Sequence, residues 1–204
     1  MEISLRLENE EDYYTVEKLT REAFWEMPDR PHGCFEHYLV RKIRQCSDFI
    51  KELSYVALND SIIVGHIIYF KSKIIDSNNN EHEIISFGPV SVFPDYQRKG
   101  IGTKLIEFTL ERAKTLGYRA VMIYGHSDYY PRFGFINAKK FKITTPEGEN
   151  FDTFMICELQ KNSLNGIIGR GYQPSIFDNV TEEEIMEYDK IFPKKPGTPC
   201  FSWK

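Results

Sequence analysis

The sequence has few cysteines and no long apolar run. Its four cysteines form no C-x-x-C pair and no zinc-type spacing, so we expect free structural thiols rather than a metal site or a disulfide framework. The longest apolar stretch, Ile62 to Phe70, is interrupted by Gly65 and His66 and is too short to span a bilayer. The acidic N-terminus lacks the basic start and apolar core of a signal peptide. These absences predict a cytoplasmic protein that does not enter the membrane.

An excess of positive charge is also lacking. The formal net charge is -4 and the pI is about 5.8, so no overall basic field would recruit nucleic acid. Hydrophobic residues make up 41% of the chain and aromatic residues 14%, which is enough to build a core and argues against a wholly disordered chain. A length of 204 residues suits one domain with an appendage.

The spacing of apolar and turn residues predicts a mixed α/β arrangement. The expected helices are one capped by Asn9 and ended by the prolines of Met27 to Pro31, one at about Phe35 to Arg44, one at about Gly100 to Leu116 closed by Gly117, and one that follows a capping box at Thr181 and runs through about Ile191. The expected strands are Leu53 to Leu58, Ile62 to Ile75, Ile84 to Phe93, Ala120 to Tyr124 and Phe154 to Leu159. Asn59-Asp60 is a hairpin signal between the first two strands.

The composition and the expected secondary structure change near residue 160, and this change suggests the domain organisation. Residues 1–160 carry the regular elements and are predicted to form the main domain. Residues 161–204 begin with a turn-rich stretch and end with a proline- and lysine-rich tail. Because this second part is too small to bury a core of its own, we expect an appendage that docks on the main domain.

The hexapeptide Q-R-K-G-I-G, Gln97 to Gly102, places two glycines at the start of an expected helix, where each lowers helix stability. A dinucleotide fingerprint would need a third glycine where Leu105 stands, and the chain contains no P-loop string. Two interpretations remain. One is an ordinary turn with a solvated basic pair, and the other is a pyrophosphate site built from the backbone N–H groups of Arg98 to Thr103.

The preceding strand supplies the context. Gly88-Pro89 interrupts it, and proline cannot donate a hydrogen bond to a neighbouring strand, so we expect a bulge or a locally free edge there. Further along, G-H-S-D-Y-Y-P-R-F-G-F gathers five aromatic residues in a tight segment. On their own, Tyr129 and Tyr130 would be interpreted as core aromatics.

Together these segments resemble a known family. S-V-F-P-D-Y-Q-R-K-G-I-G-T-K-L-I is similar to the acetyl-CoA pyrophosphate motif of the GNAT superfamily of N-acetyltransferases, Q/R-x-x-G-x-G/A, and the second segment resembles the Y-Y-x-R-F-G-F signature of one bacterial subgroup. The matching region covers roughly residues 3 to 160. The resemblance implies a mixed α/β acyltransferase fold of the GNAT type. Its central sheet would be mixed and mostly antiparallel, with a splayed strand pair and helices on both faces.

The resemblance also implies a site for acetyl-CoA as acyl donor, with no metal. Tyr130, four residues before the glycine of the G-F pair, would be the general acid. The interrupted strand would pair with the pantetheine arm, and the glycine turn would hold the pyrophosphate. The implied cofactor-binding residues are Val90, Val92, Gln97, Arg98, Lys99, Gly100, Ile101, Gly102 and Thr103.

The expected activity is acetyl transfer to a primary amine by direct attack in a ternary complex. Phe133 and Phe135 are expected to pack rather than to bind cofactor, and Arg132 either forms an ion pair or approaches the cofactor. Candidates for the general base by residue type alone are Glu26, Asp29, Glu83 and His126. The alternative is a non-catalytic acyl-CoA-binding or regulatory module. The acceptor, a small molecule or a protein amine, stays open, as does a homodimer; no nucleic acid or membrane partner is expected.

Overall fold

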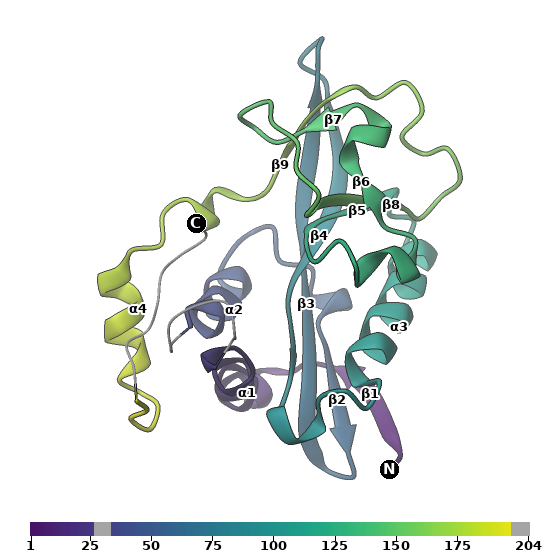
Figure 1. The fold of residues 1–204 in the computed structure, drawn as a ribbon. Coiled ribbons are helices and arrows are strands. Elements are labelled where there is room, and N and C mark those ends of the chain that lie inside the picture. Colours follow the sequence, from purple (N-terminus) through teal and green to yellow (C-terminus); the bar gives the residue numbers. More distant parts are fainter. Residues whose placement is uncertain (27–33, 197–204) are drawn as a thin grey trace. The chain divides into compact units, whose positions relative to one another are not determined.

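In the computed structural model, which describes residues 1–26 and 34–196, the chain divides into two compact units (Figure 1). Unit 1 comprises Met1–Ile68, Pro89–Leu105 and the chain from Ser175 onward, and unit 2 comprises Tyr69–Gly88 and Ile106–Pro174. The expected helix end at Met27 to Pro31 and the thiol of Cys200 lie outside the described residues.

The sheet of unit 1 begins with a strand that the sequence analysis missed. Strand β1 (Ile3–Leu7) pairs antiparallel with β2 (Tyr55–Asn59), which pairs antiparallel with the first part of β3 (Ile62–Asp76). The alternation of apolar and polar residues in I-S-L-R-L is the period-2 signal that would have revealed β1. The hairpin signal at Asn59-Asp60 is confirmed, because β2 and β3 flank it and Asp60 has a positive φ of 54°.

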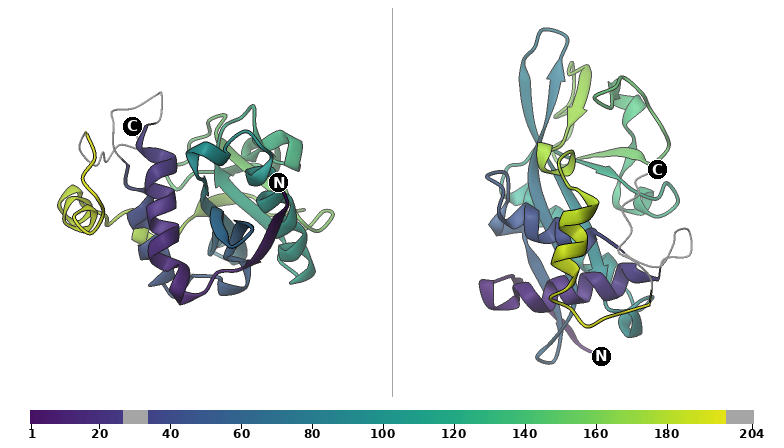
Figure 2. Two further views of the ribbon diagram at one scale, coloured as in Figure 1. Left: turned by 90° about the horizontal axis from the view of Figure 1, so that it is seen from below. Right: turned by 90° about the vertical axis from the view of Figure 1, so that its left-hand side faces the viewer.

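The helices of unit 1 begin where the sequence placed their caps. Asn9 and Asp12 form a capping box around η1 (Glu10–Asp12), which continues into α1 (Tyr13–Trp25), and Thr181 and Glu184 form another at the start of α4 (Glu182–Asp189). Helix α2 is Glu36–Arg44, as expected. Helix α4 is shorter than expected and ends at Asp189 rather than near Ile191. Figures 1 and 2 show α4 beside the α1–α2 pair.

The turn before helix α3 also belongs to unit 1. A short helical turn, η3 (Pro94–Tyr96), precedes α3 (Ile101–Thr115), whose first residues pack against β3. A Cβ atom at Gly65 of β3 would lie 3.0 Å from Ile101 and 3.1 Å from Leu105, so the glycine permits this close approach. At the other end of α3, Gly117 adopts a φ of 87°, which confirms the expected C-terminal cap.

Unit 2 is built on strands in the order β4–β5–β8–β6. Strand β4 (Glu81–Val92) pairs parallel with β5 (Ala120–Tyr124) at Ile85–Val121 and Ser86–Met122, and β5 pairs antiparallel with β8 (Phe154–Glu158) along its whole length. Strand β8 also pairs antiparallel with the short β6 (Ile136–Asn137). The expected mixed, mostly antiparallel fold is therefore confirmed.

Three short strands of unit 2 were not expected. They are β6, β7 (Ile143–Thr144) and β9 (Gly169–Tyr172); β9 pairs antiparallel with the end of β3 and parallel with β7. Strands of two to four residues carry too little periodicity to be recognised from sequence. Two further helical turns are η4 (Tyr130–Phe133) and η5 (Ala138–Phe141), and η6 (Ser175–Phe177) lies in unit 1.

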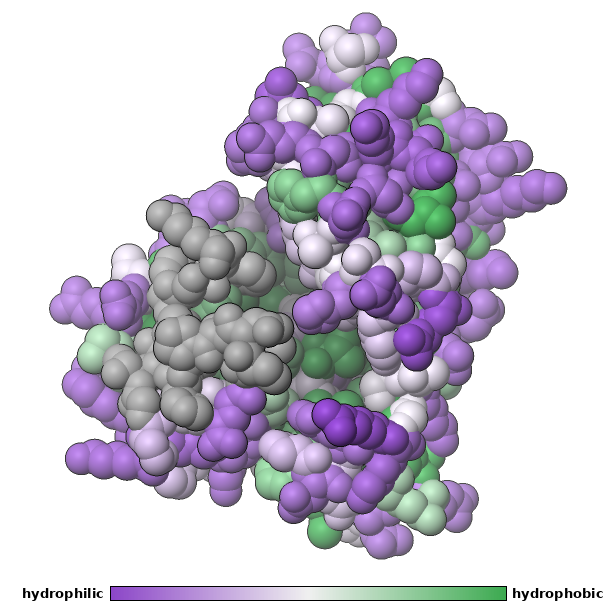
Figure 3. Space-filling model, in the orientation of Figure 1, coloured by the Kyte–Doolittle hydropathy of each residue, from purple (hydrophilic) through white to green (hydrophobic). Residues whose placement is uncertain are grey.

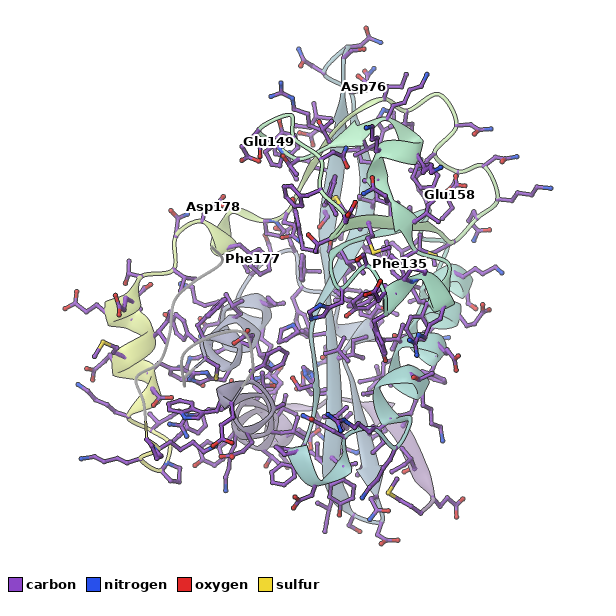
Figure 4. The ribbon with its side chains drawn as sticks, in the orientation of Figure 1. Asp76, Phe135, Glu149, Glu158, Phe177 and Asp178 are labelled. Atoms are coloured by element: carbon purple, nitrogen blue, oxygen red, sulfur yellow. The ribbon has the colours of Figure 1, made fainter. Side chains whose placement is uncertain are left out.

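The core of unit 2 is apolar, and its outer tip is polar. Residues from β3, β4, β5, η5, β7, β8 and the segment before β9 make one cluster: Ile74, Ile84, Ala120, Met122, Ala138, Ile143, Phe154, Ile156, Leu164 and Ile167. The tip of the β3–β4 hairpin is mostly hydrophilic (Figure 3), and Asp76 lies at its base (Figure 4). Within the described ranges, the model contains no helix that combines the length and apolar character needed to cross a bilayer.

The predicted boundary at residue 160 does not coincide with the division into units. Residues up to Pro174 belong to unit 2, and the chain from Ser175 belongs to unit 1. In unit 1, Val180 and Ile185 are buried in a cluster with Phe35 and Leu39 of the α2 region. The separation into a 1–160 domain and a 161–204 appendage stays a prediction.

Candidate functional site

The glycine turn adopts a backbone that favours anion binding. Arg98 has a φ of 60° and Gly100 a φ of 81°, so left-handed residues alternate along the turn, as they do in backbone anion-binding turns. The Lys104 N–H donates the first hydrogen bond within α3, to the Gly100 carbonyl at 2.9 Å. The N–H groups of Ile101 and Gly102 therefore find no carbonyl within the helix. This turn therefore lies at the positive end of the α3 dipole, beside backbone N–H groups that have no partner within the helix.

Two side chains of the turn donate to nearby backbone carbonyls, and a third is exposed to solvent. Gln97 Nε2 donates to the Val92 carbonyl at 3.1 Å, and Lys99 Nζ donates to the Asp95 carbonyl at 2.8 Å. Arg98 is exposed and forms no ion pair with any described residue. A Cβ atom at Gly100 would meet no protein atom within 4 Å. Gln97 and Lys99 thus stabilise the turn, whereas the exposed Arg98 guanidinium could contact an anion.

The part of β4 in unit 1 presents the two valines expected to face the cofactor. Val90 and Val92 are half-buried, and Ser91 between them is buried, with its hydroxyl donating to Thr20 Oγ1 of α1 at 2.9 Å. The Phe93 N–H donates to the Val64 carbonyl of β3 at 3.0 Å. These bonds fix the strand. The Val92 carbonyl accepts from Gln97 Nε2, so it is already bonded within the protein.

Tyr130 stands in unit 2, in the turn that follows β5. The backbone N–H groups of Tyr129 and Tyr130 both donate to the His126 carbonyl, at 3.0 Å and 3.3 Å. The Tyr130 ring packs between Phe87 and Phe135, with centroid separations of 5.9 Å and 5.7 Å. Its hydroxyl forms no hydrogen bond with a described residue. Burial, with a smaller contribution from Tyr129, raises the pKa of the Tyr130 hydroxyl, so that it stays protonated at neutral pH.

A glycine that the sequence analysis did not single out positions this ring. A Cβ atom at Gly125 would lie 2.3 Å from Tyr130 Cε2, so any other residue there would displace the tyrosine. The only local signal was a glycine directly after a predicted strand. Phe135 is buried, as expected for a packing residue. Arg132 forms no ion pair with a described residue; its guanidinium donates to the Tyr129 carbonyl at 2.8 Å and lies 4.6 Å from the Tyr129 ring centroid.

The candidate bases that the structure describes are all exposed. Glu26 is exposed at the end of α1, His126 is exposed after β5, and Asp29 lies outside the described residues. Glu83 is exposed and forms an ion pair with Lys71 at 3.3 Å. Across residues 1–26 and 34–196, His, Cys, Asp and Glu form no group that could hold a metal ion.

Two of the three described thiols are buried. Cys34 and Cys157 are buried and Cys46 is half-buried, and none of the three is in a disulfide within the described residues. Cys157 is buried beneath the Tyr130 turn, its Sγ 3.6 Å from the Phe133 carbonyl. Burial, with a smaller contribution from Glu158, raises the pKa of the Cys157 thiol to about 11. A thiol protonated at neutral pH is a poor nucleophile.

Comparisons with known proteins agree with this geometry. A model described as the acetyltransferase (GNAT) family matches residues 12–135. The uncharacterized N-acetyltransferase YjhQ of Escherichia coli K12 is 34% identical over 83 residues, which is 41% of this chain. The match spans 45% of the length of that relative, so less than half of it is covered.

Two solved structures resemble the fold. The GNAT family N-acetyltransferase YhbS from E. coli, solved in complex with CoA, has a TM-score of 0.74 at 22% identity, over 88% of this chain and 93% of that one. A GNAT family acetyltransferase from Brucella melitensis, solved with acetyl-CoA, has a TM-score of 0.68 at 26% identity, over 87% of this chain and 99% of that one. Because the family model covers more than half of the sequence, the chain belongs to the acetyltransferase (GNAT) family.

Proposed function

We propose that this chain transfers the acetyl group of acetyl-CoA to a primary amine by direct attack within a ternary complex. The observation that carries the proposal is the turn before α3, where Arg98 and Gly100 adopt positive φ, an alternation that suits a backbone anion site. The bound acetyl-CoA of the Brucella relative supports the choice of ligand.

The turn would bind the pyrophosphate of the cofactor. The N–H groups of Ile101 and Gly102 would donate to phosphate oxygens, and the Arg98 guanidinium would supply formal positive charge. The remaining residues of the proposed cofactor set are Val90, Val92, Gln97, Lys99, Gly100 and Thr103. Val90 would pair its backbone with the pantetheine arm, while Gln97 and Lys99 keep the turn in shape.

Tyr130 would donate a proton to the departing thiolate. The amine nitrogen attacks the thioester carbonyl carbon, the carbon–sulfur bond breaks, and its electron pair moves to sulfur. The Tyr130 hydroxyl donates to that sulfur, while the proton of the attacking nitrogen leaves to a base that is not assigned. The raised pKa of Tyr130 keeps the donor protonated before each turnover.

The test of the enzyme against a non-catalytic acyl-CoA module is thiol release. With a panel of amines, the wild-type protein is expected to release CoA from acetyl-CoA. Tight binding of acetyl-CoA by calorimetry without release under any condition would favour the non-catalytic module.

The residue assignments are tested by two variants. Tyr130→Phe is expected to lower turnover by about 10²–10⁴ and leave the Kd for acetyl-CoA unchanged, since it removes only the proton donor. Tyr129→Phe, the neighbouring tyrosine with its ring 5.2 Å away, is the matched control and should retain activity. Equal losses in both variants would remove Tyr130 from the mechanism.

Gly100→Val tests the pyrophosphate site. The side chain would project into open space at a position with φ of 81°, so it should both strain the turn and obstruct the ligand. Binding of acetyl-CoA by calorimetry is expected to disappear. Gly117→Val, with a φ of 87° and open surroundings at the far end of α3, is a control for backbone strain alone.

A further inference from the structure

Unit 1 has a groove where the start of α1 lies beside the end of α2. Its volume is about 430 Å³, which is within the range of small-molecule sites. No residue of the Gln97-to-Gly102 turn lines it, so the groove is separate from the proposed pyrophosphate site. Figure 1 shows α1, α2 and α4 side by side. The groove is lined by residues of η1, α1, α2 and the chain after α4, among them Glu10, Tyr13, Tyr14, Arg41, Arg44 and Ile191.

The buried side of the groove holds charges that are already engaged within the protein. The Arg44 side chain is 3% exposed, and its guanidinium donates to Glu17 at 2.7 Å and also to Glu8. The same guanidinium lies 4.1 Å from the Tyr13 ring centroid. Glu17 accepts a further hydrogen bond from the Tyr188 hydroxyl. These contacts hold Arg44 and Glu17 in place, so neither is the group that would recognise a charged ligand.

Arg41, one turn earlier on α2, carries a charge that no described acidic side chain neutralises. It is exposed, its Cζ lies 4.9 Å from the Tyr188 ring centroid, and the Tyr188 hydroxyl accepts one of its N–H groups. It forms no ion pair within residues 1–26 and 34–196. A guanidinium is a planar fork that binds a carboxylate through two parallel hydrogen bonds, and contact with an aromatic ring orients it beforehand. Arg41 is therefore suited to bind a carboxylate.

Glu10, in η1, brings the opposite charge to the same groove. It is exposed and forms no ion pair with a described residue. Of the charged side chains that line the groove, Arg44 and Glu17 pair with each other. Arg41 and Glu10 are thus the two lining charges that lack an opposite partner in the described part of the chain. The groove offers a ligand one cation and one anion.

The groove also exposes apolar surface that is already fixed in place. Tyr14 is 49% exposed and Ile191 is 50% exposed. The Tyr14 ring stacks on the buried ring of Phe192, with centroids 5.4 Å apart and planes 13° apart. The Ile191 N–H donates to the Tyr188 carbonyl at 3.2 Å. An apolar group that packs on Tyr14 and Ile191 leaves water without having to order them first.

We propose that this groove binds a small zwitterion with an apolar side chain, such as an amino acid or a short peptide. Its carboxylate pairs with Arg41, its ammonium pairs with Glu10, and its side chain packs on Tyr14 and Ile191. A ligand with a single charge leaves either Arg41 or Glu10 without a partner, whereas a zwitterion meets both. The ligand is bound and not acetylated, so the inference goes beyond the proposed acetyl transfer and does not depend on it.

The probes are L-phenylalanine and the dipeptide Phe-Phe, each titrated by calorimetry into the full chain without acetyl-CoA. At least one is expected to bind at millimolar concentration. Arg41→Gln and Glu10→Gln should each weaken that binding about tenfold, because each removes one charge-assisted contact. The matched controls are Lys42→Gln and Glu11→Gln, which change the neighbouring charge of the same sign outside the groove and should bind as the wild type does.

Derivatives of the bound probe test the two charges from the side of the ligand. The N-acetyl derivative lacks the ammonium, and the C-terminal amide lacks the carboxylate. Each is expected to bind the wild-type protein at least about tenfold more weakly than the unmodified probe. An affinity as high as that of the unmodified probe, for either derivative, would contradict recognition of a zwitterion.

Failure of both probes to bind overturns the inference. So does binding that Arg41→Gln and Glu10→Gln leave unchanged, because the probe then occupies another site, and so do equal losses in the control variants. The proposed acetyl transfer has a separate readout. Absence of thiol release from acetyl-CoA with every amine would refute that transfer, whereas binding in the groove is measured without acetyl-CoA.

Discussion

Unit 1 buries charged groups, whereas the buried polar side chains described in unit 2 are all hydroxyls. The buried charged or titratable polar residues of unit 1 are Glu8, Asp12, Glu17, Arg21, Glu36, His37 and His66. The buried polar residues of unit 2 are Ser72, Ser86, Thr109 and Thr145, none of which carries a charge. Two ion pairs of unit 2, Lys71–Glu83 and Lys73–Glu81, are exposed, and the Asp76–His82 pair is partly buried.

The charges of unit 1 form connected groups. Arg44 donates to Glu8 and, at 2.7 Å, to Glu17, and Glu17 accepts from the Tyr188 hydroxyl. Arg21, 1% exposed, donates twice to Asp189, at 2.6 Å and 2.8 Å. Two elements far apart in sequence, α1 and α4, are therefore joined through charge. We therefore expect unit 1 to respond to charge removal and to acid, and unit 2 to the loss of apolar volume.

Arg44→Met is expected to have the largest effect. It leaves two buried carboxylates without their cation, and the loss of a partner from a buried ion pair costs about 3–5 kcal/mol. The free energy of unfolding, measured with urea, should fall by that amount. Lys71→Met, which breaks an exposed pair in unit 2, should change it by less than about 1 kcal/mol. Equal changes in the two variants would end the distinction between the units.

Acid should destabilise unit 1 first. Burial alone would raise the pKa of the Glu8 carboxyl, but His66 and Arg44 together lower it from 4.5 to about 2. A depressed pKa stabilises the folded state above about pH 4.5, and that contribution, of order 3 kcal/mol, is lost as the pH falls toward 2. Native-state hydrogen exchange should show α1 and β1 amides losing protection between pH 5 and about pH 2 before those of β5 and β8. Simultaneous loss in both units would contradict the prediction.

Asp189→Asn is expected to lower the free energy of unfolding by about 1.5–3 kcal/mol, because it removes the negative charge that pairs with the buried Arg21 guanidinium. Burial raises the pKa of the Asp189 carboxyl, but His37 and Arg21 outweigh it, so the pKa is lowered and the group is ionised at neutral pH. Limited proteolysis should cut the chain after Ser175 faster in this variant. Glu187→Gln, in an exposed pair with Lys190, is the control and should resist cleavage as the wild type does.

Ile156→Val should have the smallest effect. Ile156 is fully buried in the core of unit 2, and removal of one methylene costs about 0.5–1.5 kcal/mol. Because no buried charge of the described unit 2 core is involved, the difference from wild type should be the same at pH 4 and pH 7. A difference that grows in acid would show that charge also contributes to the stability of this core.

Much of the fold could be predicted because its signals are local. The capping boxes at Asn9 and Thr181, the strand at Ala120–Tyr124 and the cap at Gly117 each depend on a few adjacent residues. The short β6, β7 and β9 could not be predicted, because their pairing partners lie elsewhere in the chain. Within the site, the Gln97-to-Gly102 turn was recognisable, but Gly125 acquires its role only once Tyr130 folds over it.

The main helices, the longer strands, the glycine turn before α3 and the membership of the family follow from the sequence alone, since each depends on residues close together in the chain. Which charges are buried, and which partner each one meets, follows only from the tertiary structure. Arg21 and Asp189 are 168 residues apart, and Glu17 and Tyr188 are 171 apart. The physical reason is that a buried charge is tolerated only with a partner in place, and a partner so distant in sequence is provided by packing, which no local pattern encodes.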